Sequence, residues 1–132
     1  MSLNDEERKI VIQLEIEKAK SIFNQINELA YLGYWDNIAN RLYYALFHAV
    51  SALLIYDKHS VGTHKGAVAL FGQHYVKTGV FSLSDGRLYS QLQTMREKSD
   101  YNCTYEMTEE EVAPKITPAK LLIERIENFI SQ

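Results

Sequence analysis

The stretch 35-WDNIANRLYYALFHAVSALLIYDK-58 decides the fold, because it is the longest apolar-rich segment that no glycine or proline interrupts. A helix turns by about 100° per residue, so nearly the whole circumference of a helix over 35–58 is apolar. Such a helix is buried, either inside its own domain or against a partner. One face carries Ile38, Leu42, Ala45, Ala49, Ala52, Leu53 and Tyr56, and Tyr43, Leu46, Phe47, Val50 and Leu54 cover most of the rest.

A narrow polar stripe completes this predicted helix. It consists of Asn37, Arg41, Tyr44, His48 and Ser51 at spacings i, i+4, i+7, i+11 and i+14. An unpaired buried polar group costs roughly 1–3 kcal/mol, so the stripe needs partners from elsewhere in the molecule. The identity of those partners is the central question for function.

The segment before it, residues 4–32, has the pattern of one long amphipathic helix. Asn4 or Asp5 can cap its start, and Gly33 supplies the left-handed residue at which helices often end. Only two or three residues then lead to the helix over 35–58, so the two helices should form an antiparallel hairpin. The apolar stripe is Ile12, Ile16, Ala19, Phe23, Ile26 and Ala30, with Ile22 and Leu29 beside it.

Three further helical segments follow. Thr63 can cap a helix over 65–78, and Leu88, Leu92 and Met95 give residues 85–101 a core face. Thr108 begins a short turn over 109–113, and Thr117-Pro118 favours a main helix over 118–130. A single helix kinked at Pro114 and Pro118 is the alternative. Because no strand pattern is present, we predict an all-α, up-and-down bundle of about five helices, forming one domain over 1–132.

Composition narrows the class of protein. The chain has 132 residues, 46% of them apolar, and no apolar run approaches the roughly 18 residues of a membrane span. The N-terminus is acidic and polar, unlike a secretory signal. The single Cys103 excludes an internal disulfide and a multi-cysteine metal site. We therefore expect a cytoplasmic protein that is not inserted in a membrane.

The net charge of −3 excludes a strongly basic nucleic-acid binder. Residues 34–100 nevertheless carry seven basic and five acidic groups, which permits a local phosphate-binding surface. The four histidines, at 48, 59, 64 and 74, form neither a Glu-x-x-His nor a His-x-x-x-His pattern, and no phosphate-binding glycine loop is present. We expect no metal and no cofactor.

Arg41 and His48 form the candidate catalytic pair, because a separation of seven places both on one helix face. Histidine moves protons near neutral pH, and the planar fork of arginine holds a phosphate and stabilises charge as it develops. On RNA the ribose 2′-hydroxyl is an internal nucleophile, so no metal is required. The alternative is structural, with His48 hydrogen-bonded in the core.

A second cluster lies in 95-MREKSDY-101. Arg96 and Asp100 are four residues apart and can pair with each other, or Asp100 can accept from Arg41 on the central helix. In the structural interpretation, the ion pair fixes helix packing. In the functional interpretation, Arg96 is a second phosphate ligand. Tyr44, together with Tyr43, can line a nucleotide pocket, although a helical tyrosine is more often core or interface.

Three segments in this order resemble the HEPN domain family: 41-RLYYALFHAVSALL-54, 63-THKGAVALFGQHYVKTG-79 and 92-LQTMREKSDY-101. The nearest pattern is a small stand-alone group with an Arg-x-Tyr-Tyr-Ala-x-Phe-His core and a later Arg-x-x-x-Asp-Tyr. The resemblance implies a five-helix bundle that dimerises through helices flanking the motif. Many members are metal-independent ribonucleases, often toxins of toxin–antitoxin or defence systems, and others pair with a small nucleotidyltransferase.

Active members of the family carry an arginine, four to six residues and then a histidine, and here six residues separate Arg41 from His48. Leu42 stands where active enzymes usually have a polar residue. The resemblance implies Arg41 and His48 as the catalytic pair, with Tyr44, Arg96, Asp100 and Tyr101 binding substrate or supporting the site.

Three functional hypotheses follow. The first is a homodimeric, metal-independent endoribonuclease of the toxin type. The second is a non-catalytic module that binds a nucleotide, RNA or a nucleotidyltransferase-type antitoxin through the same surface. The third is a purely structural stripe, with Arg41 paired to Asp100.

Overall fold

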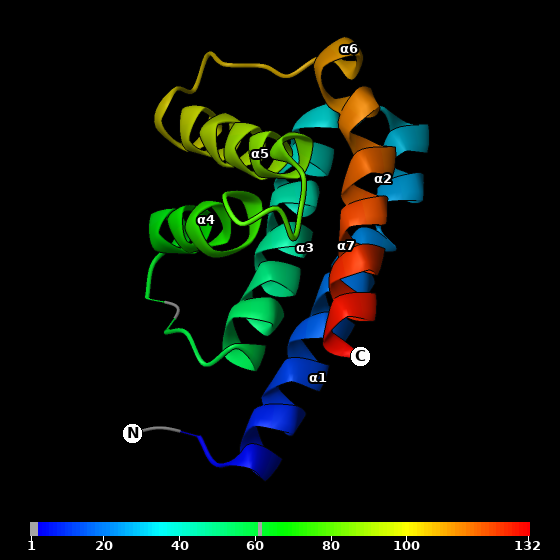
Figure 1. Cartoon of the computed structure of the whole chain (residues 1–132). Helices are drawn as coiled ribbons and strands as arrows, with labels where there is room; N and C mark the ends of the chain where they lie inside the picture. Colours follow the sequence, from blue (N-terminus) through cyan, green and yellow to red (C-terminus); the bar gives the residue numbers. More distant parts are fainter. Residues whose placement is uncertain (1–2, 61) are drawn as a thin grey trace.

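The computed structural model describes residues 3–60 and 62–132, and all regular secondary structure in these ranges is helical. The predicted all-α bundle is therefore confirmed, and Figure 1 shows its arrangement. The elements are α1 Asp5–Phe23, α2 Ile26–Leu32, α3 Trp35–Tyr56, α4 His64–Phe71, a π-helical turn Gly72–Val76, α5 Leu83–Tyr101, α6 Glu109–Val112, a 3₁₀ turn Ala113–Lys115 and α7 Ile116–Ile130.

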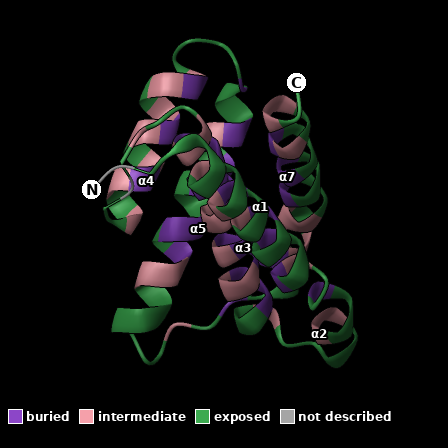
Figure 2. Cartoon of the chain, turned by 90° about the horizontal axis from the view of Figure 1, so that it is seen from below, coloured by how far each residue is buried: buried purple, intermediate pink, exposed green. Residues whose placement is uncertain are grey.

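Helix α3 is the centre of the molecule, as predicted. It contacts every other α-helix, most extensively α1, which runs antiparallel to it (Figure 1). Helix α7 lies beside both α3 and α1, while α4 and α5 run across α3. The buried positions of each helix face this shared interior (Figure 2). Twelve residues of α3 are buried, among them Ile38, Leu42, Tyr43, Leu46, Val50 and Leu53.

The first helix of the hairpin is broken in two, which corrects the prediction of one helix over 4–32. The α1 ladder ends because the N–H of Gln25 bonds to the carbonyl of Ile22, three residues back, in the manner of a 3₁₀ turn. Ile22 and Ile26 are buried on either side of the break, so the apolar pattern alone did not reveal it. Gly33 ends α2 with φ +76°, the left-handed conformation expected.

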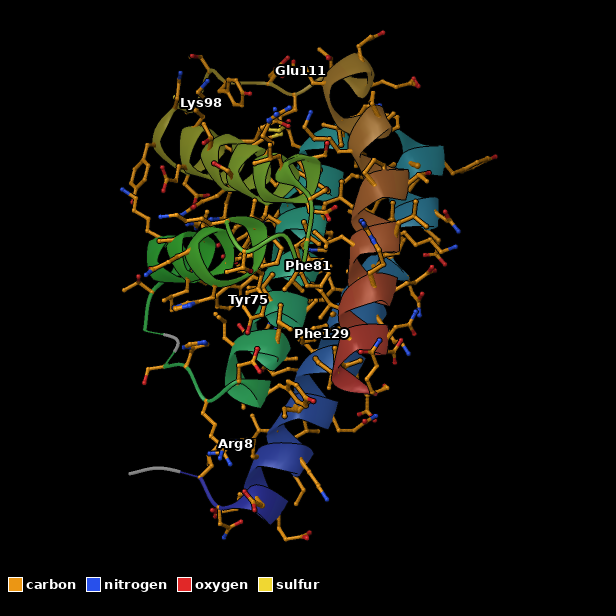
Figure 3. The ribbon with its side chains drawn as sticks, viewed as in Figure 1. Arg8, Tyr75, Phe81, Lys98, Glu111 and Phe129 are labelled. Atoms are coloured by element: carbon orange, nitrogen blue, oxygen red, sulfur yellow. The ribbon has the colours of Figure 1, made fainter. Side chains whose placement is uncertain are left out.

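Thr63 caps α4 as predicted, accepting a hydrogen bond from the N–H of Gly66. The helix continues through the π-helical turn to Gly79, where φ is +84°. Three aromatic side chains then tie this region to α7: Tyr75, Phe81 and Phe129 lie within 6.1–6.4 Å of one another by ring centroid (Figure 3). These contacts hold α4 in a fixed position against the rest of the bundle.

The C-terminal segment forms two α-helices joined by a 3₁₀ turn. Helix α7 begins at Ile116, so the predicted start at Pro118 with Thr117 as cap is wrong by two residues. The 3₁₀ turn passes directly into α7, and no extended capping residue is needed. Pro118 is the third residue of α7, where a backbone N–H has no intrahelical partner to lose.

The length and apolar character of α3 would allow it to cross a bilayer. However, 67% of its most apolar window is buried by the other helices. Such burial is typical of the core helix of a folded domain, and it agrees with the prediction that the helix over 35–58 is buried.

Replacing Leu46 by alanine should destabilise the protein by about 2–5 kcal/mol, because the side chain is fully buried and its removal leaves a cavity. Leu121→Ala on α7 is the matched control, since Leu121 is 49% exposed and should change stability by less than about 0.5 kcal/mol. Urea denaturation measures both. Equal losses in the two variants would contradict the central position of α3.

Candidate functional site

The polar stripe on α3 runs from solvent into the core. Asn37 is exposed, Arg41, Tyr44 and His48 are half-buried, and Ser51 is buried with no hydrogen-bond partner for Oγ among the described residues. The centre of the stripe is therefore open to a ligand while its position is fixed by packing. A fully buried stripe would have been only structural.

Arg41 is held by its neighbour in sequence. Its Nε and Nη2 both donate to Oδ1 of Asn40, at 3.2 and 2.7 Å, and its guanidinium lies 5.6 Å from the ring centroid of Tyr44. The predicted alternative of an ion pair between Arg41 and Asp100 is wrong. Among the described residues no carboxylate neutralises Arg41, so its charge is available to an anion.

His48 has a partner that the sequence did not suggest. Its Nδ1 lies 3.1 Å from Oε2 of Glu15 on α1, and the two side chains are 22% and 26% exposed. Because a carboxylate only accepts, Nδ1 carries a proton and Nε2 is left for another group. The only signal in the sequence was that Glu15 flanks the buried stripe of the helix antiparallel to α3.

Arg96 pairs with Asp100, as one of the two predicted alternatives proposed. Its Nη1 lies 3.1 Å from Oδ2 of Asp100, and its guanidinium lies over the ring of Tyr43, at 5.0 Å from the centroid. The ring centroids of Tyr43 and Tyr44 are 5.1 Å apart, and each of these adjacent tyrosines contacts one of the two arginines. The Nε of Arg96 is buried without a hydrogen-bond partner among the described residues, an unsatisfied donor at the site.

His64 is a further member that sequence reasoning missed. It is the first residue of α4, and its Nδ1 lies 2.6 Å from the hydroxyl of Tyr43. Its ring packs 4.5 Å from Phe47 and 5.8 Å from Tyr44. Nothing in the spacing of the four histidines distinguished it, because the contact depends on how α4 crosses α3.

Burial raises the pKa of Tyr43 to about 12, although nearby Arg96 opposes the shift. Tyr43 is therefore a neutral phenol, and its hydroxyl shares a hydrogen bond with Nδ1 of His64. Burial lowers the pKa of His64, and the positive charge of Arg96 and the proximity of His48 add to the effect. The neutral form of His64 is therefore favoured.

These residues form one group, which we call the Arg–His cluster: Arg41, Tyr43, Tyr44, Phe47 and His48 from α3, His64 from α4, Arg96 from α5, and Glu15 from α1. Four helices thus bring two arginines and two histidines onto one aromatic platform. The arrangement can bind a phosphate and move a proton beside it.

The remaining predicted residues lie outside the cluster or support it. Asp100 orients Arg96, whereas Tyr101 is 88% exposed and makes no contact with the cluster in the part of the chain described. His59 and His74 stack on each other at 4.2 Å. Within residues 3–60 and 62–132, no three His, Cys, Asp or Glu side chains are grouped so as to hold a metal ion.

The sequence of the chain is similar to those of several known proteins. Residues 12–129 match the model of the HEPN domain. A UPF0332 protein of Thermotoga maritima is 32% identical over 124 residues, covering 94% of both chains. A protein of Methanocaldococcus jannaschii named "Putative toxin MJ0605" is 33% identical over 75% of this chain and 72% of its own. A second from that organism, "Putative toxin MJ0142", is 23% identical over 87% and 78% of the two chains.

The lowered pKa of His64 predicts a specific pH dependence of stability. An unfolded histidine titrates near 6.5 and the folded one below it, so the unfolded state binds more protons as the pH falls through about 6.5. The His64 contribution is therefore complete above that pH and is lost below it. The free energy of unfolding of the wild type, minus that of His64→Gln, should decrease between pH 7.5 and 5. Parallel pH curves for the two proteins would contradict the assignment.

Proposed function

The chain belongs to the HEPN domain family, and from this premise we propose that it is a metal-independent, toxin-type ribonuclease that uses the Arg–His cluster. The observation that supports this best is the charge of Arg41, which no carboxylate among the described residues neutralises, on the half-exposed face of α3 that also carries His48. A purely structural cluster would pair Arg41 with a carboxylate, and an RNA phosphate would supply that missing anion.

In the proposed reaction Arg41 binds the scissile phosphate and His48 takes the proton of the adjacent ribose 2′-hydroxyl. The 2′-oxygen forms a bond to phosphorus while the bond to the 5′-oxygen breaks, and water protonates the leaving oxygen. The products are a 2′,3′-cyclic phosphate and a 5′-hydroxyl. Glu15 orients the imidazole of His48 through Nδ1, so Nε2 is the atom that accepts the proton.

Arg41 and His48 are separated by two turns, about 10.5 Å along the helix axis. Their side chains therefore contact a nucleotide and its phosphate from opposite ends. Arg96 and the imidazole of His64 both contact Tyr43, which lies between Arg41 and His48 along α3, and Arg96 would stabilise the charge on the phosphate oxygens. Tyr44 packs against Arg41 and His64 and holds this arrangement.

We also propose that the protein acts as the toxin of a toxin–antitoxin pair, because two relatives are named as toxins. The antitoxin would be a nucleotidyltransferase-type protein encoded next to it. Co-expression with the product of the neighbouring gene, followed by affinity purification of this chain, should recover a stoichiometric complex. Recovery of this chain alone would remove the partner from the proposal.

The active form would be a homodimer in which two copies of the cluster share one cleft. Ile10 and Leu14 support this, because both are more than half exposed on α1, the helix that carries Glu15. Size-exclusion chromatography with light scattering should give about twice the mass of the 15.2 kDa chain. If the protein is a monomer at micromolar concentration, the shared cleft is wrong and the site belongs to a single chain.

The test of the ribonuclease is cleavage of a mixed-sequence RNA with EDTA present. His48→Ala should reduce the cleavage rate about 10²–10⁴-fold, the usual contribution of a general base. Arg41→Ala should reduce it about 10²–10³-fold, as for other losses of transition-state charge stabilisation. His59→Ala and Arg87→Ala, which remove the same side-chain types away from the cluster, are the matched controls and should cleave at the wild-type rate.

Circular dichroism must show that the variants are folded. Equal cleavage by the wild type and both cluster variants would remove the catalytic assignment. If the wild type binds the RNA without cutting it, and Arg41→Ala abolishes binding, the cluster is instead a non-catalytic RNA-binding surface.

A further inference from the structure

A second recess lies immediately beside Arg41, and the proposed mechanism does not use it. It has a volume of about 300 Å³, at the low end of ligand pockets in proteins, which suits one small planar group. It lies between α2 with its preceding turn and the first half of α3. We call it the amide hollow, after its lining of Gln25, Leu29, Asn37, Asn40 and Arg41.

Three of the five lining side chains are amides. Asn40 is oriented, because its Oδ1 accepts two hydrogen bonds from Arg41 and its Nδ2 is left to donate elsewhere. In the described part of the chain, no hydrogen bond involves the side-chain amides of Gln25 or Asn37. The hollow therefore offers several donors and acceptors that no protein group occupies.

No carboxylate lines the hollow, and the one charged group in it is Arg41. The Nε and Nη2 of Arg41 are committed to Asn40, and the rest of its fork is assigned to the scissile phosphate. The interior is thus neutral and polar, with Leu29 as an apolar wall. This combination suits the edge and face of a nucleobase better than it suits a second phosphate.

Adenine is the base that amides recognise best. One Asn or Gln side chain offers a donor and an acceptor in one plane, which match N7 and the N6 amine of adenine. Guanine presents two acceptors on that edge and is read instead by an arginine fork, which is unavailable here. In single-stranded RNA this edge is open to side chains.

A neighbouring recess limits the extent of the site. It shares Asn37 with the amide hollow, but it also contains Asp36 and Glu106. Asp36 accepts a 2.7 Å hydrogen bond from the N–H of Met107, so this carboxylate is fixed in place. Two carboxylates repel the RNA backbone, and the hollow therefore has room for one nucleotide beside the cluster.

We propose that the amide hollow is a base-specificity subsite that binds an adenine of single-stranded RNA next to the scissile phosphate. This proposal rests on the proposed ribonuclease function. With the phosphate on Arg41, the bond from Asn40 to Arg41 links recognition of the base to placement of the phosphate. The enzyme would then cut preferentially at one side of adenine.

The test maps cleavage in an RNA that contains all sixteen dinucleotides. The wild type should cut beside adenine at least about 10-fold more often than beside cytosine or uracil, as expected for one bidentate base contact. In Asn37→Ala and Gln25→Ala this preference should fall below about 3-fold. Asn27→Ala, an exposed amide of α2 outside the hollow, is the matched control and should keep the preference. Replacing the adenine by 7-deazaadenine or purine should also abolish it.

Cleavage without base preference, or a preference that survives in both variants, would overturn the subsite and leave the ribonuclease intact. If the wild type does not cleave at all, the proposed function fails and the subsite is tested by binding. Fluorescence anisotropy with oligoadenylate and oligouridylate should then show about 10-fold tighter binding of the adenine oligomer, lost in Asn37→Ala. Equal affinities would overturn the subsite as well.

Discussion

The burial of α3 is the constraint on which the rest of the structure depends. A helix that is apolar on nearly every side must be covered on nearly every side, and α1, α4, α5 and α7 supply this cover. Its polar stripe cannot be turned to bulk water without exposing apolar residues on another side. The stripe therefore lies where the covering helices leave an opening. Three of these helices supply partners to the stripe and to the adjacent buried Tyr43: Glu15 of α1 contacts His48, while His64 of α4 and Arg96 of α5 contact Tyr43.

The polar contacts of this protein are of two kinds. Some only stabilise the packing, and others leave groups available to a ligand. Where a group is purely structural, as in the capping box of Ser82 and Asp85, the hydrogen bonds are reciprocal and Arg125 also pairs with the carboxylate. In the Arg–His cluster the contacts instead fix the orientation of the side chains, while some donors and some positive charge have no partner among the described residues. Arg41 is held by a neutral amide, and Arg96 keeps a buried Nε without a partner among the described residues. Groups that are oriented but not satisfied are pre-organised for a ligand, at a cost in folding stability.

The sequence predicted the parts of this picture that depend on local pattern. The apolar periodicity of 35–58 located the central helix, Thr63 located the start of α4, and Gly33 located the end of α2. The four-residue spacing from Arg96 to Asp100 anticipated their ion pair. The break at Asn24 and Gln25 was not predictable from the apolar stripe, since Ile22 and Ile26 keep the pattern across it. His64 and Glu15 were missed because their roles come from helix crossing, which no single-helix periodicity encodes.

The tyrosine pair contributes to the placement of both arginines. The face of an aromatic ring attracts a cation, so Tyr44 stabilises the guanidinium of Arg41, and Tyr43 stabilises that of Arg96, which also pairs with Asp100. The hydroxyl of Tyr43 also hydrogen-bonds to Nδ1 of His64, whose pKa is lowered chiefly by burial, so that a third positive charge in the cluster is disfavoured. One side chain thus contacts both an arginine and a histidine. Both arginines and His64 therefore meet at the two adjacent tyrosines in the sequence RLYYALFH, residues 41–48.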